Sequence, residues 1–201
     1  MRIALTFDTE HPGRPCPPGV EDRILETLES AGIRATFFLQ GRWARAYPER
    51  ARRIAEAGHL VGNHSHHHAP MDAFTDEWFR RDVRDAEETI RTIAGVDPLP
   101  WFRCPFGSGM EDPRVLAILE ELGYRHVGWD VDPRDWEEGR TVDELVTRVV
   151  GGLQDRDEAI VLLHGWPGVT GEGLSALLAR LAGAEFVDVA ELAHRTVARN
   201  E

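Results

Sequence analysis

The chain has 201 residues, a formal net charge of −12 and two cysteines, Cys16 and Cys104. A chain of this length can bury one sizeable hydrophobic core unaided, so we expect a single domain over residues 1–201. The acidic excess argues against nucleic acid and anionic lipid as partners, because both would repel the chain at long range. The cysteines form neither a C-x-x-C pair nor a disulfide framework.

The chain opens on an apolar run at residues 3–7, which is too short for a signal peptide and ends at an acid. No other stretch approaches the length of a membrane span. The sequence therefore predicts a cytoplasmic protein without a membrane partner, or a secreted one if a leader has been removed.

From this run onward, one pattern recurs: a charged segment of helical period ends in glycine, and a short apolar run follows. Glycine supplies the left-handed residue that closes a helix, and short apolar runs suit buried parallel strands. The pattern predicts seven strands, mostly alternating with helices, at residues 3–7, 35–39, 59–61, 99–102, 126–129, 159–163 and 185–189.

This alternation predicts an α/β fold with a parallel sheet, either an open doubly wound sheet or a closed barrel. No G-x-G-x-x-G follows the first strand, so nothing specific supports a dinucleotide-binding sheet. Polar residues follow the ends of many different strands, which is typical of a (β/α) barrel. We therefore expect a distorted (β/α) barrel of about seven parallel strands.

Residues 63–68, Asn-His-Ser-His-His-His, form the most informative segment. On a helical turn, His64 and His68 would lie at i and i+4 and could offer two imidazoles to one metal ion. A solvated histidine-rich loop fits the same letters. The segment by itself leaves the two interpretations open.

Asp8 and Glu10 follow the first predicted strand, where two carboxylates could complete a metal site and supply a base. Lone acids at such positions more often cap helices or end solvated loops. His164 similarly ends an apolar run, and an isolated histidine there is more often structural than catalytic. Because Asp8, Glu10 and His164 directly follow apolar runs predicted to be buried strands, we favour a functional role for them.

Taken together, these fragments resemble the polysaccharide deacetylases, the NodB-homology group or fourth carbohydrate esterase family. Five motifs occur in the family's order along nearly the whole chain. They are residues 6–8 (the start of T-F-D-D), 63–68 (N-H-[ST]-x-x-H), 103–107 (R-x-P-[YF]-G), 132–136 (D-x-x-D-W) and 162–164 (L-x-H).

The resemblance implies one divalent metal, usually zinc, with cobalt, nickel or manganese as alternatives. His64 and His68 would be metal ligands, and Asp8 would be the general base that activates water. Arg103 would hold Asp8 ionised and oriented. The backbone N–H of Phe106 would help to stabilise the oxyanion.

The resemblance also assigns the acid. His164, paired with Asp135, would protonate the leaving amine, and Trp136 would wall one side of the acetyl pocket. Amide hydrolysis needs separate groups to activate water and to protonate the leaving group, which agrees with this division.

The chain departs from the family at the second acid of T-F-D-D, the usual third metal ligand, where Thr9 stands. A neutral hydroxyl is a poor zinc ligand. Some members show D-x-[DE], and Asp8-Thr9-Glu10 fits that variant, so we expect Glu10 to be the carboxylate ligand.

The resulting hypothesis is a metal-dependent hydrolase that removes N-acetyl or O-acetyl groups from an acetylated sugar or oligosaccharide. The alternative is a carbon–nitrogen hydrolase of the same fold acting on a small cyclic amide, ureide or formamide. A third hypothesis is a non-catalytic sugar- or metal-binding protein.

Overall fold

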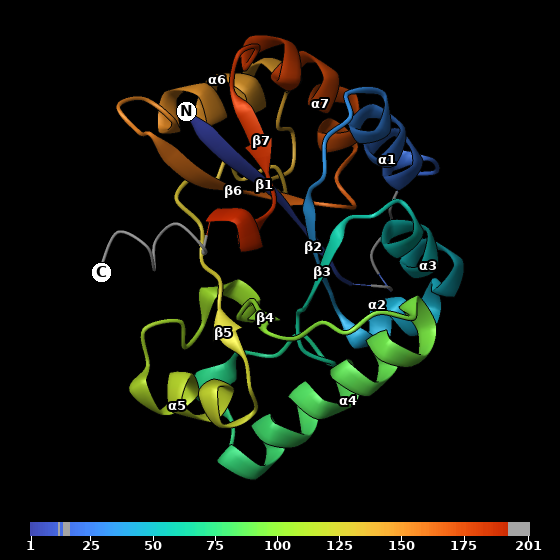
Figure 1. The fold of residues 1–201 in the computed structure, drawn as a ribbon, viewed down its shortest axis with the longest axis vertical. Coiled ribbons are helices and arrows are strands. Elements are labelled where there is room, and N and C mark those ends of the chain that lie inside the picture. Colours follow the sequence, from blue (N-terminus) through green and yellow to red (C-terminus); the bar gives the residue numbers. More distant parts are fainter. Residues whose placement is uncertain (12, 14–16, 193–201) are drawn as a thin grey trace. The chain divides into compact units, whose positions relative to one another are not determined.

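The structure, a computed structural model, describes residues 1–11, 13 and 17–192 (Figure 1). These residues include a seven-stranded sheet in the order β5-β4-β3-β2-β1-β6, with β7 paired to β1. The strands are β1 Arg2–Thr9, β2 Thr36–Leu39, β3 Leu60–Asn63, β4 Trp101–Phe102, β5 Arg125–His126, β6 Glu158–His164 and β7 Glu185–Val187. The helices are α1 Val20–Ser30, α2 Gly41–Ala46, α3 Pro48–Glu56, α4 Asp76–Ala94, α5 Pro113–Glu121, α6 Val142–Gly152 and α7 Gly168–Arg180, with short 3-10 helices η1 Met71–Ala73 and η2 Pro105–Gly107.

The chain divides into two compact units. The first unit comprises Met1–Phe7, Pro15–Thr36 and Trp129–Glu201, and the second unit comprises Asp8–Arg14 and Phe37–Gly128. That residues 1–201 act as a single domain stays a prediction.

In the first unit, β7 lies parallel to the start of β1, with Ile3 opposite Phe186. Helices α1 and α6 both pack against α7 (Figure 1). Val131 forms a parallel bridge with Val161 of β6. This bridge holds the segment that carries Asp135 beside the strand that ends at His164.

In the second unit, β3, β4 and β5 are parallel, with Asn63 opposite Phe102 and Phe102 opposite His126. The long helix α4 packs against α2 and α3 (Figure 1). Because β3 and β4 are neighbours that end at the same level, the residues after them, His64 and Arg103, start from adjacent strand ends. The core of this unit contains a cluster of buried residues. They are Met71, Phe79, Val83, Phe102, Cys104, Val115, Ile118, Leu119 and Tyr124.

All seven predicted strands are present, although β4 and β5 have only two residues each. β5 lies at Arg125–His126 and not at the expected 126–129, because its pairing with β4 ends at His126. The glycines predicted to follow helices have positive φ angles between 65° and 95°, as a left-handed closing residue requires. They are Gly32, Gly58, Gly95, Gly123 and Gly183.

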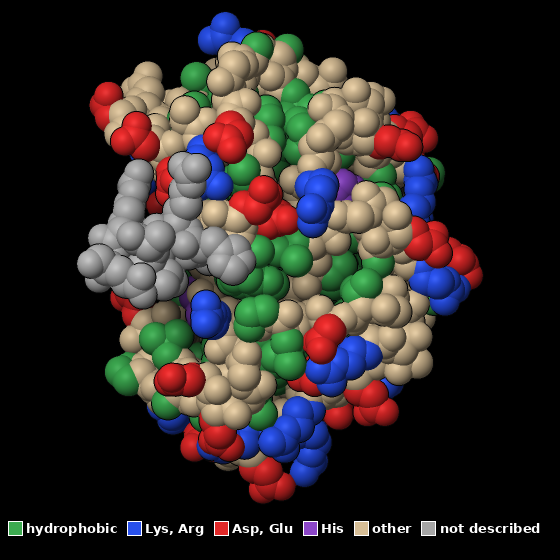
Figure 2. Space-filling view, viewed as in Figure 1, with side chains coloured by type: hydrophobic (Ala, Val, Ile, Leu, Met, Phe, Trp, Pro, Cys, Tyr) green, Lys and Arg blue, Asp and Glu red, His purple; other side chains and the backbone are tan. Residues whose placement is uncertain are grey.

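Acidic and basic side chains are interspersed on the face shown in Figure 2, so the acidic excess does not form one continuous patch there. The second unit contains exposed pairs of opposite charge, such as Arg80 with Glu121 and Arg91 with Asp97. None of the helices in the described ranges has the length and apolar character needed to cross a membrane.

Candidate functional site

The side chains of Asp8, Thr9 and Glu10, at the end of β1, point alternately to opposite faces of the sheet. Successive side chains of a strand point to opposite faces, so Asp8 and Glu10 share one side and Thr9 takes the other. The buried Thr9 hydroxyl donates to the carbonyl oxygen of Phe38 at 3.2 Å. The Thr9 side chain is therefore bound to the backbone, and the two carboxylates at the end of β1 are those of Asp8 and Glu10.

The loop at residues 63–68 is not the helical turn on which the i and i+4 pairing of His64 and His68 would depend. Ser65 and His68 have φ angles of 63° and 57°, which are left-handed and interrupt any right-handed turn. Asn63 accepts the Ser65 N–H through Oδ1 at 2.8 Å, and the Ser65 hydroxyl accepts the His68 N–H at 2.9 Å. These side-chain bonds replace the helical backbone bonds and fold the loop tightly.

The folded loop nevertheless brings His64 and His68 together with Glu10. The two Nε2 atoms lie 3.1 Å apart, His64 Nε2 lies 3.3 Å from Glu10 Oε2, and His68 Nε2 contacts the same oxygen. His64 Nδ1 lies 2.9 Å from the carbonyl oxygen of Arg103, so it donates and leaves the Nε2 lone pair directed at the cluster.

Two imidazole nitrogens and a carboxylate oxygen are a ligand set that zinc prefers. In a tetrahedral site with bonds of about 2.0–2.1 Å, neighbouring ligand atoms are about 3.3 Å apart. His64 Nε2 lies 3.1 Å from His68 Nε2 and 3.3 Å from Glu10 Oε2, close to this value, whereas His68 Nε2 and Glu10 Oε2 lie nearer to each other. The residue types and the two His64 distances fit a divalent metal ion.

The electrostatics of the cluster favour a charged carboxylate. Burial opposes ionisation of Glu10, but hydrogen bonds from His11, His64 and His68 hold its pKa well below its ordinary value. Burial lowers the pKa of His68, which keeps this imidazole neutral and able to bind a metal. For His64, the nearby Asp8 and Glu10 charges outweigh burial and raise the pKa.

His11 is not among the site residues predicted from the sequence. Its Nε2 lies 3.1 Å from Glu10 Oε1, the oxygen that does not contact the other two histidines. Its backbone N–H donates to Gln40 Oε1 at 3.0 Å, and its ring centroid is 4.5 Å from that of His68. Glu10, His11 and His68 also satisfy the spacing of a metal site. Its position next to Glu10 was the only available signal.

Asp8 is held by the fully buried Arg103. Nη1 of Arg103 donates to Asp8 Oδ1 at 3.0 Å, and the guanidinium also donates to the carbonyl oxygens of Val127 and Gly128. The ring of Phe38 lies 4.2 Å from the guanidinium carbon. Asp8 Oδ2 remains on the other side, 3.5 Å from His64 Nε2, beside the metal-binding cluster.

Phe106 borders the same cluster. Its ring centroid lies 4.4 Å from that of His68, and 65% of the residue is exposed. It has a φ angle of 58° within η2. Such strain at a non-glycine residue is common at functional sites.

In the first unit, His164 and Asp135 form a tight buried pair. His164 Nδ1 lies 2.7 Å from Asp135 Oδ1, while Asp135 Oδ2 accepts the His164 backbone N–H at 2.8 Å and the Thr170 hydroxyl at 2.6 Å. These contacts hold the imidazole through Nδ1 and through the His164 backbone N–H. Trp136 is 43% exposed, with Arg134 over its ring at 5.6 Å.

Comparison with known proteins identifies the family of the chain. A family model described as polysaccharide deacetylase matches residues 1–127, more than half of the chain. The chain belongs to the polysaccharide deacetylase family. The family resemblance seen in the motifs is thereby confirmed.

Two curated relatives are named as deacetylases. The chitooligosaccharide deacetylase of Azorhizobium caulinodans is 32% identical over 162 residues, covering 81% of this chain and 72% of that protein. The peptidoglycan-N-acetylglucosamine deacetylase of Bacillus cereus is 32% identical over 166 residues, covering 83% of this chain and 56% of that protein. The chain thus spans about half of the latter relative's length.

A solved structure supports the fold class. A CE4 family pseudoenzyme from Bacillus anthracis matches with a TM-score of 0.84 and 28% identity, covering 95% of this chain and 64% of that one. A mutant of that pseudoenzyme is described as having restored enzymatic activity. The predicted α/β fold, a distorted (β/α) barrel with about seven parallel strands, is confirmed.

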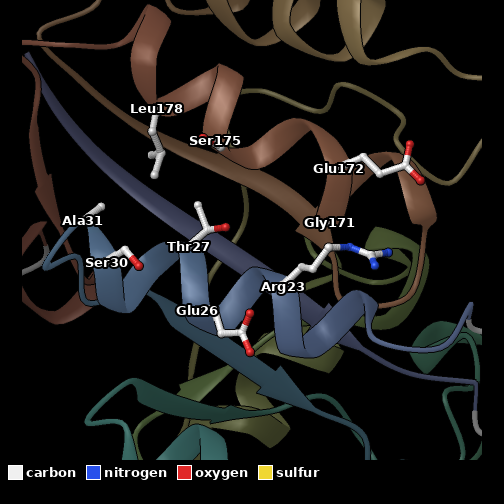
Figure 3. Close-up of a pocket in the computed structure, with 9 residues that line it drawn as sticks. All are labelled: Arg23, Glu26, Thr27, Ser30, Ala31, Gly171, Glu172, Ser175 and Leu178. Carbon is white, nitrogen blue, oxygen red and sulfur yellow. The ribbon is translucent and has the colours of Figure 1, made fainter.

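Two other features of this polysaccharide deacetylase chain involve none of the predicted site residues. An open groove of about 540 Å³ runs between α1 and α7 of the first unit (Figure 3). Its lining, which includes Arg23, Ser30 and Glu172, contains none of those residues. Burial raises the pKa of the Cys104 thiol to about 12, so it is no nucleophile at neutral pH, and Cys16 lies outside the described residues.

Proposed function

We propose that this polysaccharide deacetylase chain is a metal-dependent hydrolase that removes acetyl groups from an acetylated sugar or oligosaccharide. The observation that carries the proposal is the convergence of Glu10, His64 and His68 beside the Arg103-bound Asp8. The names of the two curated relatives support an N-acetylated oligosaccharide or glycan as substrate class.

We propose zinc as the metal and Glu10, His64 and His68 as its ligands, with His11 orienting Glu10 through Oε1. A bound divalent ion supplies a Lewis acid for the acetyl carbonyl and lowers the pKa of the water it binds. His11 would bind one carboxylate oxygen of Glu10 and so leave the other oxygen for the ion. Carboxylates that bind metals are commonly oriented by such hydrogen-bond partners.

The proposed base is Asp8. Arg103 occupies its Oδ1 and keeps the carboxylate fixed, so Oδ2, on the side of the metal-binding cluster, is the atom that accepts the proton of the attacking water. The backbone N–H of Phe106 is the proposed donor to the developing oxyanion.

The proposed acid is His164. Asp135 accepts from Nδ1 and orients the ring, and Nε2 of the imidazolium is the proposed proton donor to the leaving amine or alcohol. Trp136 is the proposed wall of the acetyl pocket.

A non-catalytic metal- or sugar-binding role is the second candidate, because a pseudoenzyme of the same family matches the chain with a TM-score of 0.84. The intact Asp8–Arg103 and His164–Asp135 pairs favour catalysis over this role.

The test is acetate release from chitin oligomers, acetylated xylan oligomers, peptidoglycan fragments and small amides. We expect release from acetylated sugars that stops with a chelator and returns with zinc. Hydrolysis of small amides alone would favour the cyclic-amide alternative, and zinc binding without any turnover would favour the non-catalytic role.

Two variants assign the carboxylates. Asp8→Asn should retain zinc but lose activity, because an amide cannot accept the proton of water at neutral pH. Glu10→Ala should bind zinc more weakly and recover part of its activity at high zinc concentration. If Asp8→Asn loses its metal and Glu10→Ala does not, Asp8 is the ligand and another group is the base.

A further inference from the structure

The loop that carries both metal-binding histidines is a strained piece of backbone. Ser65 and His68, both in this loop, have positive φ angles although neither is glycine. Such conformations persist only where the surrounding structure over-determines them. The contacts of the intervening residues, His66 and His67, therefore decide whether the loop keeps its shape.

Those contacts converge on Asp82, a side chain of α4 that is 2% exposed. Asp82 Oδ2 accepts the backbone N–H of His66 at 2.9 Å, and Oδ1 accepts the backbone N–H of His67 at 3.2 Å. Oδ1 also lies 2.5 Å from His67 Nδ1. One carboxylate thus binds two successive peptide groups between the strained residues.

The carbonyl side of the loop is held by the start of α2. The Gly41 N–H donates to the Ser65 carbonyl at 2.9 Å, and the Arg42 N–H donates to the His66 carbonyl at 3.2 Å. A Cβ at Gly41 would lie only 2.3 Å from His66 Nδ1, so the loop packs directly on this helix start. The loop is clamped between α2 and Asp82, both in the second unit.

We propose that Asp82 is a positioning residue for the metal site. By binding the N–H groups of His66 and His67, it maintains the loop conformation in which the Nε2 atoms of His64 and His68 lie 3.1 Å apart. The inference rests on the proposed function only in taking these two histidines as ligands. Asp82 itself does not contact the metal-binding atoms.

The experiment measures the zinc affinity of the full chain. Bound metal is first removed with a chelator, and zinc binding is then measured by competition with a chromophoric chelator at a temperature below unfolding. Asp82→Asn replaces one acceptor oxygen by an NH₂ group that faces an N–H donor. We expect zinc affinity to fall by about 10–100-fold, as for other outer-shell substitutions. Glu88→Gln, on the exposed face of the same helix, is the matched control and should bind zinc like the native chain.

A second variant separates the backbone clamp from the ring contact. His67→Ala removes the imidazole but retains both peptide N–H groups, so its zinc affinity should stay within a few-fold of native. At saturating cobalt, Asp82→Asn should also alter the visible absorption of the bound ion, whereas His67→Ala and Glu88→Gln should not. A general loss of stability would lower the melting temperature without changing this spectrum.

Native zinc affinity in folded Asp82→Asn would overturn the proposal, as would an equal loss in His67→Ala. Absence of zinc binding by the native chain would overturn it together with the assigned ligands. If Asp82→Asn does not fold, Asp82→Glu takes its place. It keeps both oxygens but displaces them by one methylene, so native affinity in this variant would equally overturn the proposal. Failure of the native chain to release acetate would refute the proposed function without changing these affinities.

Discussion

The buried Asp8–Arg103 pair allows a quantitative test, because the structure gives an acceptor for each of the three guanidinium nitrogens. Arg103→Met keeps an apolar stem but removes the donors to Asp8, Val127 and Gly128. Breaking a buried ion pair costs about 3–5 kcal/mol. Each carbonyl left without a donor costs roughly 1–3 kcal/mol. Since these costs overlap and Met restores part of the packing, we expect a total loss of about 5 kcal/mol.

The assay is urea unfolding of the metal-free chain, followed by tryptophan fluorescence, in a double-mutant cycle with Asp8→Asn. Each single variant leaves one buried charge unpaired, whereas the double variant leaves none. The double variant should therefore be more stable than additivity predicts by about 0.5–3 kcal/mol. Arg80→Met, which removes an exposed partner of Glu121, is the control and should barely move the urea midpoint.

Strict additivity, or a loss below about 1 kcal/mol for Arg103→Met, would refute the ion pair as the source of stability. The Asp8 carboxylate would then have to be held by other contacts. Its proposed role as a fixed base would need a different physical explanation.

Three further outcomes are expected. Asp135→Asn should lower turnover by at least ~10²-fold, because the His164 imidazolium loses its carboxylate partner, and zinc affinity should stay unchanged. Loss of both acetate release and bound zinc would instead indicate a structural role for Asp135. Burial lowers the pKa of His126 from 6.5 to about 4, so the unfolded chain binds one more proton between these values and stability should rise with pH across them. His126→Gln should flatten that part of the pH profile in chemical denaturation, and an unchanged profile would contradict the assignment. Gly41→Ala should destabilise by about 1–3 kcal/mol, since its Cβ would lie 2.3 Å from an imidazole nitrogen, whereas Gly151→Ala meets nothing within 4 Å and should not lower the melting temperature.

The elements of the fold could be predicted from the sequence because they depend on local properties. Short apolar runs form buried strands wherever a sheet is available, and a glycine such as Gly95, with a φ angle of 73°, closes α4 without steric cost. The extents of β4 and β5 could not be predicted, because a strand ends where its neighbour stops pairing.

The residue types of the site were also readable from the chain. The spacing of Asp8, His64 and His164 along it, together with the family motifs, was sufficient to name candidate ligands, base and acid. Their roles stay predictions until the variants are measured.

Only the tertiary structure decided how these residues are held. Asp8 and Arg103 are 95 positions apart; the family resemblance implied their pairing, but no local pattern records that they meet in a buried pair. The 63–68 loop departs from a helical turn because the Asn63 and Ser65 side chains accept hydrogen bonds within it, while Asp82 of α4 and Gly41 of α2 hold its backbone from outside. The local sequence determines which backbone conformations have low free energy. Contacts between residues distant in sequence select among these conformations, since they can offset the strain of one that the local sequence disfavours.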